Sequence, residues 1–504
     1  MRRCSQTPVS SSTPSCRTTS LIGIDLGTSA IKAVVYAIDG TPLASARRAV
    51  PGYRPRPGHS EVKVEESREA FWSTLAEVCS DPKVRKDPPV AISFSSSGRE
   101  VFPVSDDGTP LGPCLMTADT RGDDVAAQTA ARRSPEEWFR LTGHVPRRMD
   151  PINRALWWRK ADPDVAAKTR WFMNWHEYYA LLLSGRPIVD WSDAGAWATY
   201  DVASGNWSAD RIEETGIDAK WLPEVQPNAT PIGPILPRVA GELGLRSDVL
   251  IVAGAWDAFA ASVGAGAVDP GVVALACGTW HSFTLAVEAG WPAELVNEGM
   301  NICPHPGPTG FGILGTNPNG MSVIDWARDL FGISIPELNL ALAAVGAEPG
   351  DVFADAALTP LPHASGARGQ GATFEGITLA TKGVDVIRAL LEAIACEFSL
   401  TIERLGRRGI ESSLVRATGG GAKLDWWLQL HADVCGIPFE VVAQDEPGAF
   451  GAAILAGVGA GIYPSVSSAV GKLVAVSRRF EPDTERGARY GAVRKRLGAR
   501  EMSP

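Results

Sequence analysis

Two apolar stretches of the chain repeat one pattern about 250 residues apart. The first, LIGIDLGTSAIKAVVY, covers residues 21–36, and the second, VVALACGTWHSFTL, covers residues 272–285. In each, an apolar run ends in Gly-Thr and a second apolar run follows, which predicts two strands joined by a glycine turn. The recurrence predicts two related half-domains that each contribute one turn to a shared site.

Other runs complete an α/β pattern. Residues 65–79 and 384–405 carry apolar side chains at helical spacing, and residues 449–460 form an apolar segment whose three glycines suit close packing. Short apolar runs at 90–94, 249–252 and 414–418 predict buried strands, and Asn317-Pro318-Asn319-Gly320 predicts the start of a helix over 321–330. Most tryptophans in 134–230 are expected in the core, with a platform for a sugar ring as the alternative.

Length and composition place the chain among ordinary globular proteins. It has 504 residues, a hydrophobic content of 45% and a net charge of -9, which together predict several domains and argue against non-specific nucleic-acid binding. Eight cysteines without a C-x-x-C pair indicate neither a metal knuckle nor a disulfide framework. The apolar runs at 249–268 and 450–463 are too polar or too short to span a membrane, so we expect a cytoplasmic protein.

Composition shifts predict the domain boundaries. Residues 1–19 are rich in Ser, Thr and Pro and contain no acid, which predicts a disordered tail; a transit peptide has a similar composition, but no amphipathic pattern supports one. The change from a proline-rich stretch to the strand at Val249 predicts a boundary near residue 247. We therefore expect domains at 20–247 and 248–482, followed by a basic tail at 483–504 that forms a short surface helix after Arg486.

Asp257 is the first candidate for chemistry. It is the only charged residue between Asp248 and Asp269, and it precedes the glycine turn at Gly278 by about twenty residues. Because the backbone N–H groups of such a turn can bind an anion, a lone acid nearby indicates proton abstraction beside a phosphate. The alternative is a helix cap followed by an ordinary hairpin glycine.

Four further polar residues follow predicted strands. Arg99 and Glu100 come directly after the serine-rich turn at 95–98, and Asp119 and Arg121 follow the short run at 115–118. Because α/β proteins bind ligands at the carboxyl edge of their sheets, these residues are candidates for binding a hydroxylated substrate. The alternative for each pair is a surface salt bridge.

Seven motifs in order resemble those of a known family. They lie between about residues 21 and 463 and read LIGIDLGTSAIK, SSSGRE, ADTR, GAWD, CGTW, GARGQGATFEGITLA and ATGGGAKLDWW. Together they resemble the FGGY family of carbohydrate kinases. The resemblance implies an actin-like, ribonuclease-H-like α/β fold, in which two related domains surround a central cleft that holds ATP, Mg²⁺ and a sugar or polyol. Dimers are frequent in that family.

The resemblance also implies roles for individual residues. Asp257 corresponds to the catalytic base, and Asp25 lies near the metal. The residues implied in ATP binding are Gly27, Thr28, Ser29, Lys32, Gly278, Thr279, Asn319, Gly420, Gly421 and Ala422. The residues implied in substrate binding are Arg99, Glu100, Asp119, Arg121 and Asp257.

The implied activity is transfer of a phosphoryl group from ATP to a hydroxyl of a small ketose or polyol, similar to xylulose, erythritol or glycerol. Arg99-Glu100 stands where many pentulose kinases carry Gln-Met-His, and Gly-Arg-Glu is similar to the glycerol kinases. The alternative is a nucleotide-binding scaffold or sensor on the same actin-like fold, without transfer to a sugar.

Overall fold

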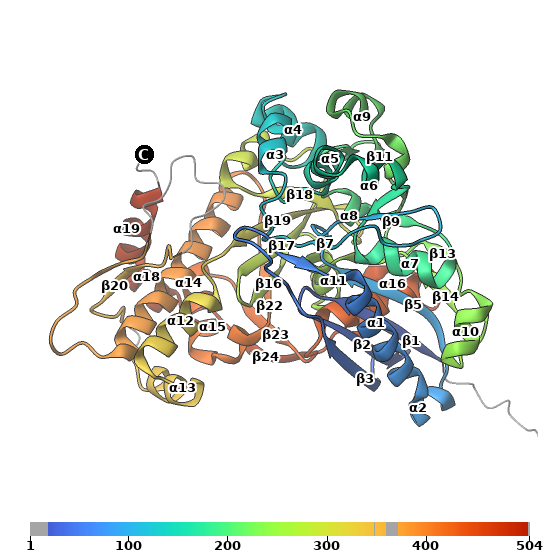
Figure 1. Cartoon of the computed structure of the whole chain (residues 1–504). Coiled ribbons are helices and arrows are strands. Elements are labelled where there is room, and N and C mark those ends of the chain that lie inside the picture. Colours follow the sequence, from blue (N-terminus) through green and yellow to red (C-terminus); the bar gives the residue numbers. More distant parts are fainter. Residues whose placement is uncertain (1–18, 347, 359–370, 502–504) are drawn as a thin grey trace, which may run out of the picture.

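The computed structural model of the chain describes residues 19–346, 348–358 and 371–501. The expected N-terminal tail up to residue 18 and positions 366–370 of the GARGQG segment lie outside these ranges. The chain forms two lobes, each built on a seven-stranded sheet, which lie side by side in Figure 1.

The sheet of the first lobe has the order β13-β14-β5-β1-β2-β3, and β15 also pairs with β5. Strand β1 is antiparallel to β2 and parallel to β5, so Asp25 lies between Lys32 and Ser95. The bounds are β1 Ser20–Leu26, β2 Ala30–Ala37, β3 Pro42–Ala49, β5 Pro89–Ser96, β13 Pro231–Pro234, β14 Leu250–Val252 and β15 Ala255–Trp256.

The sheet of the second lobe has the order β18-β19-β17-β16-β22-β23-β24. Strand β16 is antiparallel to β17 and parallel to β22, as β1 is to β2 and β5. The predicted duplication and the actin-like fold class are therefore confirmed. The bounds are β16 Val272–Cys277, β17 His281–Val287, β18 Asn301–Pro304, β19 Phe311–Asn317, β22 Leu414–Thr418, β23 Phe439–Val442 and β24 Val476–Phe480.

Two helices, α11 (Asp257–Gly264) and α16 (Pro447–Gly459), pack against each other between the sheets (Figure 1). Their contact is made by backbone rather than by large side chains. A Cβ on Gly451 would lie 1.8 Å from the carbonyl oxygen of Ala260, and a Cβ on Gly23 of β1 would lie 1.8 Å from that of Ala449. Only glycine fits these two positions, which explains Gly451 of the predicted apolar helix and Gly23 of β1.

The strand pairing moves the expected domain boundary. Strands β14 and β15 follow residue 247, yet both pair with β5 in the first sheet. The first lobe therefore continues as far as Trp256, and Asp257 is the first residue of the helix between the lobes.

Helices cover the outer faces of both sheets. The first lobe has α1 Val64–Ser80, α2 Pro82–Lys86, α7 Trp175–Ser184 and α10 Pro237–Leu243. The second has α12 Met321–Phe331, α13 Ile335–Ala343, α14 Gly383–Arg407 and α15 Asp425–Cys435, with a small β20–β21 hairpin (Phe353–Asp355 and Thr373–Glu375). Helix α17 (Val466–Leu473) instead packs on α16 and α11. The helices expected at 65–79, 321–330, 384–405 and 449–460 are present as α1, α12, α14 and α16.

The C-terminal segment expected as a basic tail folds as α18 (Thr484–Arg489) and α19 (Gly491–Glu501). These helices pack on α15 and α14, respectively, and Tyr490 between them is fully buried and donates a hydrogen bond to Glu392. The segment is thus part of the second lobe, because one aromatic side chain anchors it to the core.

An insertion after β5 forms the upper part of Figure 1. Its tryptophans Trp138, Trp158, Trp197 and Trp221 are buried together, as expected for core residues. Its elements are β6 Phe102–Val104, β7 Cys114–Leu115, α3 Asp123–Ala130, α4 Pro135–Thr142, α5 Pro151–Ala161, α6 Pro163–Lys168, β8 Trp171–Met173, β9 Ile188–Asp190, α8 Trp191–Ala194, β10 Tyr200–Asp201, β11 Asn206–Trp207, α9 Ala209–Thr215 and β12 Glu224–Gln226. Within the described ranges, no helix is long and apolar enough to cross a bilayer.

Buried His431 predicts a pH dependence of stability. Burial lowers the pKa of His431 to about 4, although its ring donates a hydrogen bond to the Trp427 carbonyl. Since an unfolded histidine titrates near 6.5, the unfolded state binds more protons between these values, and this residue destabilises the fold as the pH falls. The free energy of unfolding of the wild type, relative to that of His431→Gln, should therefore fall by about 1.4 kcal/mol for each pH unit below pH 6.5.

Urea unfolding of both proteins, followed by tryptophan fluorescence at pH 7.5, 6.0 and 5.0, measures this shift. A stability difference that stays constant across the three values would contradict the prediction.

Candidate active site

Three carboxylates from different parts of the first lobe meet at the start of α11. Asp25 lies near the end of β1, Glu100 follows β5, and Asp257 is the first residue of the helix. The charges of Asp25 and Glu100 both act on Asp257. Residues separated by up to 232 positions are therefore brought into one acidic group.

Asp257 has a shifted titration. Burial, followed by the charges of Asp25 and Glu100, raises its pKa to about 7, although its own helix donates a hydrogen bond from Ala258 N–H at 2.7 Å. A carboxylate with this pKa is a much stronger base than an ordinary aspartate and is still half ionised near neutral pH. Its side chain is only half-buried, so a ligand can reach it.

Asp25 lies beneath the N-terminus of α16. Its Oδ1 accepts a hydrogen bond from Ser95 Oγ at 2.8 Å, and a Cβ on Gly448 would come within 3.1 Å of the same oxygen. Burial raises the pKa of Asp25, which the Ser95 bond and the charge of Lys32 oppose. Lys32, implied in ATP binding, forms an ion pair with Glu446 at 2.6 Å across the junction of the lobes.

Glu100 keeps one carboxylate oxygen open. Its Oε1 accepts a hydrogen bond from Thr117 Oγ1 at 2.8 Å, whereas its Oε2 has no hydrogen-bond partner among the described residues. The side chain is fully buried. Because an unsatisfied buried carboxylate oxygen is costly, this atom marks a position where a hydroxyl donor would be stabilised.

Arg99 is held in place from two sides. Its guanidinium forms an ion pair with Asp150, and it lies 5.0 Å from the ring centroid of Trp256. Trp256 directly precedes Asp257, so Arg99 packs against the segment that carries the candidate base. Sequence reasoning did not single out Asp150, whose only local signal is its position before Pro151 at the start of α5.

Asp119 and Arg121 bind each other. Asp119 Oδ1 accepts hydrogen bonds from the backbone N–H and Nε of Arg121, both at 2.9 Å, and its Oδ2 accepts one from Ser60 N–H at 2.6 Å. Arg121 also forms an ion pair with Glu61. Burial raises the pKa of Asp119, but the Arg121 bonds outweigh it and hold that pKa below its usual value. This pair thus forms a salt bridge, as in the alternative considered above, but the bridge is largely buried rather than on the surface.

The two glycine turns lie at equivalent places in the two sheets. In the first, Gly27 is half-buried, and Thr28 and Ser29 are exposed. In the second, the carbonyl oxygen of Gly278 accepts a hydrogen bond from Met321 N–H at 2.9 Å, and that of Thr279 accepts one from Ser322 Oγ at 3.0 Å. The second turn is therefore fixed on the N-terminus of α12, next to Asn319.

The triple glycine lies against the same turn. A Cβ on Gly419, whose φ is +87°, would come within 3.0 Å of the Cys277 carbonyl oxygen, and one on Gly421 would come within 2.7 Å of the Trp427 ring. Gly420 is exposed, and Ala422 is buried with its carbonyl bonded to Arg478. The structure thus brings Gly278, Gly420, Gly421 and Ala422 to one end of the second sheet.

Family models match most of the chain. The model of the N-terminal domain of the FGGY family of carbohydrate kinases matches residues 20–264, and that of its C-terminal domain matches residues 273–460. The chain belongs to the FGGY family of carbohydrate kinases. As a member of this FGGY family, it is a carbohydrate kinase, and the first matched region ends with α11, in agreement with the strand pairing.

Curated relatives of this FGGY kinase align along nearly its whole length. It is 27% identical to the xylulose kinase of Staphylococcus epidermidis over 476 residues, covering 92% of this chain and 93% of the relative. It is 26% identical to the L-xylulose/3-keto-L-gulonate kinase of Escherichia coli over 474 residues, covering 92% of each chain.

Solved structures share the fold at lower identity. A structure described as a xyloylose kinase from Brucella ovis superposes with a TM-score of 0.89 at 23% identity, covering 95% of this chain and 98% of that one. The Plasmodium falciparum glycerol kinase with ADP gives a TM-score of 0.87 at 19% identity, covering 97% and 99%. These similarities confirm the two-lobed fold.

Proposed function

We propose that this FGGY kinase transfers the γ-phosphoryl group of ATP to a hydroxyl of a small ketose or polyol, with Asp257 as the general base. The observation that carries the proposal is the raised pKa of Asp257, about 7, between the charges of Asp25 and Glu100. Proton abstraction from an alcohol at neutral pH calls for a carboxylate tuned in this way.

The chain's own groups would divide the work as follows. Glu100 accepts a hydrogen bond from a substrate hydroxyl and orients the substrate beside α11. Asp257 takes the proton of the attacking substrate hydroxyl. At the same time the hydroxyl oxygen bonds to the γ-phosphorus of ATP, and the bond between the γ-phosphorus and the β–γ bridging oxygen breaks. The backbone N–H groups of the turns at Gly27–Ser29 and Gly278–Thr279 stabilise the phosphate charge.

The residues present fit ATP and Mg²⁺. Asp25 offers a carboxylate, the ligand type that Mg²⁺ prefers, at the N-terminus of α16, and Mg²⁺ bound there would neutralise phosphate charge. The exposed glycines at 419–420 leave space for an adenosine beside the second turn, as the family resemblance implies. Lys32 would contact the phosphates of ATP only after its ion pair with Glu446 breaks.

The named relatives support a small carbohydrate as the acceptor. By their names, these relatives act on xylulose, L-xylulose or 3-keto-L-gulonate. The Arg99-Glu100 pair is in addition similar to the motif of the glycerol kinases. Purified protein tested for ADP formation with pentuloses, tetritols, alditols and glycerol examines this proposal. Acceptor-dependent ADP formation supports it, whereas no stimulation by any acceptor in the panel would end it.

Glu100→Gln should raise the KM for the acceptor by about 10- to 100-fold, because a hydrogen bond to a charged group contributes about 1.5–3 kcal/mol. The KM for ATP should change less than about twofold, since the open oxygen of Glu100 belongs to the acceptor side. Steady-state kinetics with each substrate varied in turn measures both constants.

Glu77→Gln is the matched control, since Glu77 on the exposed side of α1 pairs, among the residues that the structure describes, only with Arg48. An unchanged acceptor KM in Glu100→Gln would remove Glu100 from the acceptor site.

A further inference from the structure

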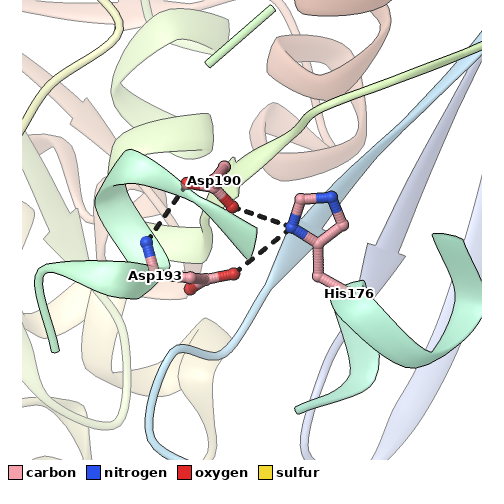
Figure 2. A group of neighbouring side chains, drawn as sticks. All are labelled: His176, Asp190 and Asp193. Carbon is pink, nitrogen blue, oxygen red and sulfur yellow. Dashed lines mark hydrogen bonds and ion pairs between the residues drawn. The ribbon is translucent and has the colours of Figure 1, made fainter. Parts of the chain in front are cut away.

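A buried polar cluster lies in the first lobe, where α7 meets β9 and α8 of the insertion (Figure 2). It consists of His176 on α7, Asp190 at the end of β9 and Asp193 on α8, all at most 1% exposed. His176 Nδ1 lies 2.7 Å from Asp190 Oδ2 and 3.5 Å from Asp193 Oδ2. One ligand atom from each residue lies within 4.8 Å of the others, which is the spacing of a metal site.

Hydrogen bonding argues against a metal in this cluster. The backbone N–H of Gly254 lies 3.3 Å from His176 Nε2. Burial lowers the pKa of the His176 ring, but the hydrogen bonds to Asp190 and Asp193 on the Nδ1 side outweigh burial and raise that pKa to about 10. When Nε2 accepts the N–H of Gly254, the ring proton lies on Nδ1. That N–H points at the two carboxylates and leaves no lone pair for a cation. Burial and the charge of Asp190 raise the pKa of Asp193 well above its usual value.

Asp190 is the centre of this network. Its Oδ2 accepts the proton of His176 Nδ1. Its Oδ1 accepts hydrogen bonds from the hydroxyl and backbone N–H of Ser192, from the N–H of Asp193 at 3.1 Å and from Asn228 Nδ2 at 2.8 Å. One carboxylate thus sets the orientation of three side chains, because each must point its donor at Asp190.

Those three side chains all bond to the same short stretch of main chain. His176 Nε2 accepts the N–H of Gly254, and Asn228 Nδ2 donates to the carbonyl oxygen of Gly254 at 2.7 Å. Ser192 Oγ accepts the N–H of Trp256 at 2.8 Å. The segment Gly254–Trp256 is therefore bonded by three side chains, and Asp257 is the next residue.

The opposite side of this segment is equally restrained. A Cβ on Gly254 would lie 2.0 Å from the carbonyl oxygen of Phe94, so the segment runs in direct backbone contact with β5. Asp193 Oδ1 comes within 2.7 Å of the Cβ position of Gly98, which precedes Arg99 and Glu100. The network thus contacts both the loop that carries Glu100 and the segment that carries Asp257.

We infer that Asp190 and the three side chains it orients, His176, Ser192 and Asn228, are positioning residues that fix the main chain at Gly254–Trp256 and so aim the carboxylate of Asp257 at the acceptor. The inference rests on the proposed role of Asp257 as the base. These residues act on Asp257 through the backbone of that segment.

Asp190→Asn tests the inference with almost no change in volume. The new amide N–H₂ facing His176 would force the ring proton onto Nε2, where it opposes the N–H of Gly254. Hydrogen exchange of the peptide spanning 253–259 should become about tenfold faster. The kcat should fall about 100-fold at nearly constant KM for ATP, since a misplacement of about 1 Å has that effect.

Asp201→Asn is the matched control. Asp201 is also an aspartate of the insertion that accepts backbone N–H groups and pairs with a cation, Arg211, but it has no contact with residues 254–256. The Asp201→Asn substitution should leave both the hydrogen exchange of the peptide spanning 253–259 and kcat unchanged. Ser192→Ala, which removes one bond to the segment, should give an intermediate effect in a protein that folds more readily.

A pair of His176 variants separates positioning from stability. His176→Gln retains an acceptor for the N–H of Gly254, whereas His176→Leu does not, and both remove the imidazole from the core. The two variants should have similar melting temperatures, but kcat should be at least about tenfold higher in His176→Gln than in His176→Leu.

Two results would overturn the inference: unchanged exchange at 253–259 in Asp190→Asn and Ser192→Ala, or a kcat within twofold of wild type in both. Either result leaves the proposed function standing, because Asp257 is tested by its own variant. Absence of kinase activity in the wild type would overturn the proposed function and the aiming of Asp257 that rests on it, and exchange at 253–259 would then report only whether the network fixes the segment.

Discussion

Asp257→Asn should lower kcat by about 10³-fold, with little change in the affinity for ATP. The substitution keeps the shape of the side chain but removes the group that would accept the proton, and general-base catalysis contributes about 10²- to 10⁴-fold. The raised pKa of Asp257, about 7, shows that its surroundings favour a proton on this carboxyl. Initial-rate kinetics with a saturating acceptor and equilibrium nucleotide binding measure the two effects.

Asp248→Asn provides the control for this prediction. Asp248 lies nine residues upstream, is exposed, and forms an ion pair with Arg246 alone within the described ranges, so its substitution should leave kcat unchanged. If Asp257→Asn retained a kcat within about fivefold of wild type, another group would have to take the proton, and the proposed mechanism would fail.

The second large effect concerns stability. Gly451→Ala should destabilise the protein by about 3 kcal/mol or more, because the added Cβ would lie 1.8 Å from the Ala260 carbonyl oxygen and 3.0 Å from the Gly264 amide nitrogen. Neither atom can move without separating α11 from α16. The expected result is a lowered urea midpoint or loss of soluble protein.

Gly471→Ala makes the same change at a helix position where the added Cβ would meet nothing within 4 Å. It should be neutral or stabilising by up to about 1 kcal/mol, because alanine favours the helix. Equal urea midpoints for the two variants would show that the contact between α11 and α16 tolerates a larger residue.

Local sequence patterns predicted much of the fold. The Gly-Thr turns flanked by apolar runs indicated the duplicated strand pairs, and the regular spacing in 384–405 indicated α14 almost to its ends. These features depend on neighbouring residues, for which periodicity and turn chemistry are reliable guides. The isolation of Asp257 among small residues also singled it out, and the structure places it in one acidic group with Asp25 and Glu100.

Pairings between distant residues could not be predicted in the same way. The Lys32–Glu446 ion pair joins residues 414 positions apart, and Arg99 pairs with Asp150 across 51 positions. Such contacts depend on how the elements pack and leave no local signal. The run at 249–252 illustrates the same limit, since its apolar character predicts a strand but not the sheet that it joins.

The position of α16 bears on how this chain folds as it is made. Leu21, Val34 and Tyr36 of the first sheet share one apolar cluster with Phe450 and Ile454 of α16, so the face formed by β1 and β2 is covered by a helix that ends at Gly459. At roughly 5–20 residues per second, the ribosome adds that helix tens of seconds after β1. Until then the nascent chain carries an uncovered apolar face, and either half of the protein expressed alone would keep one.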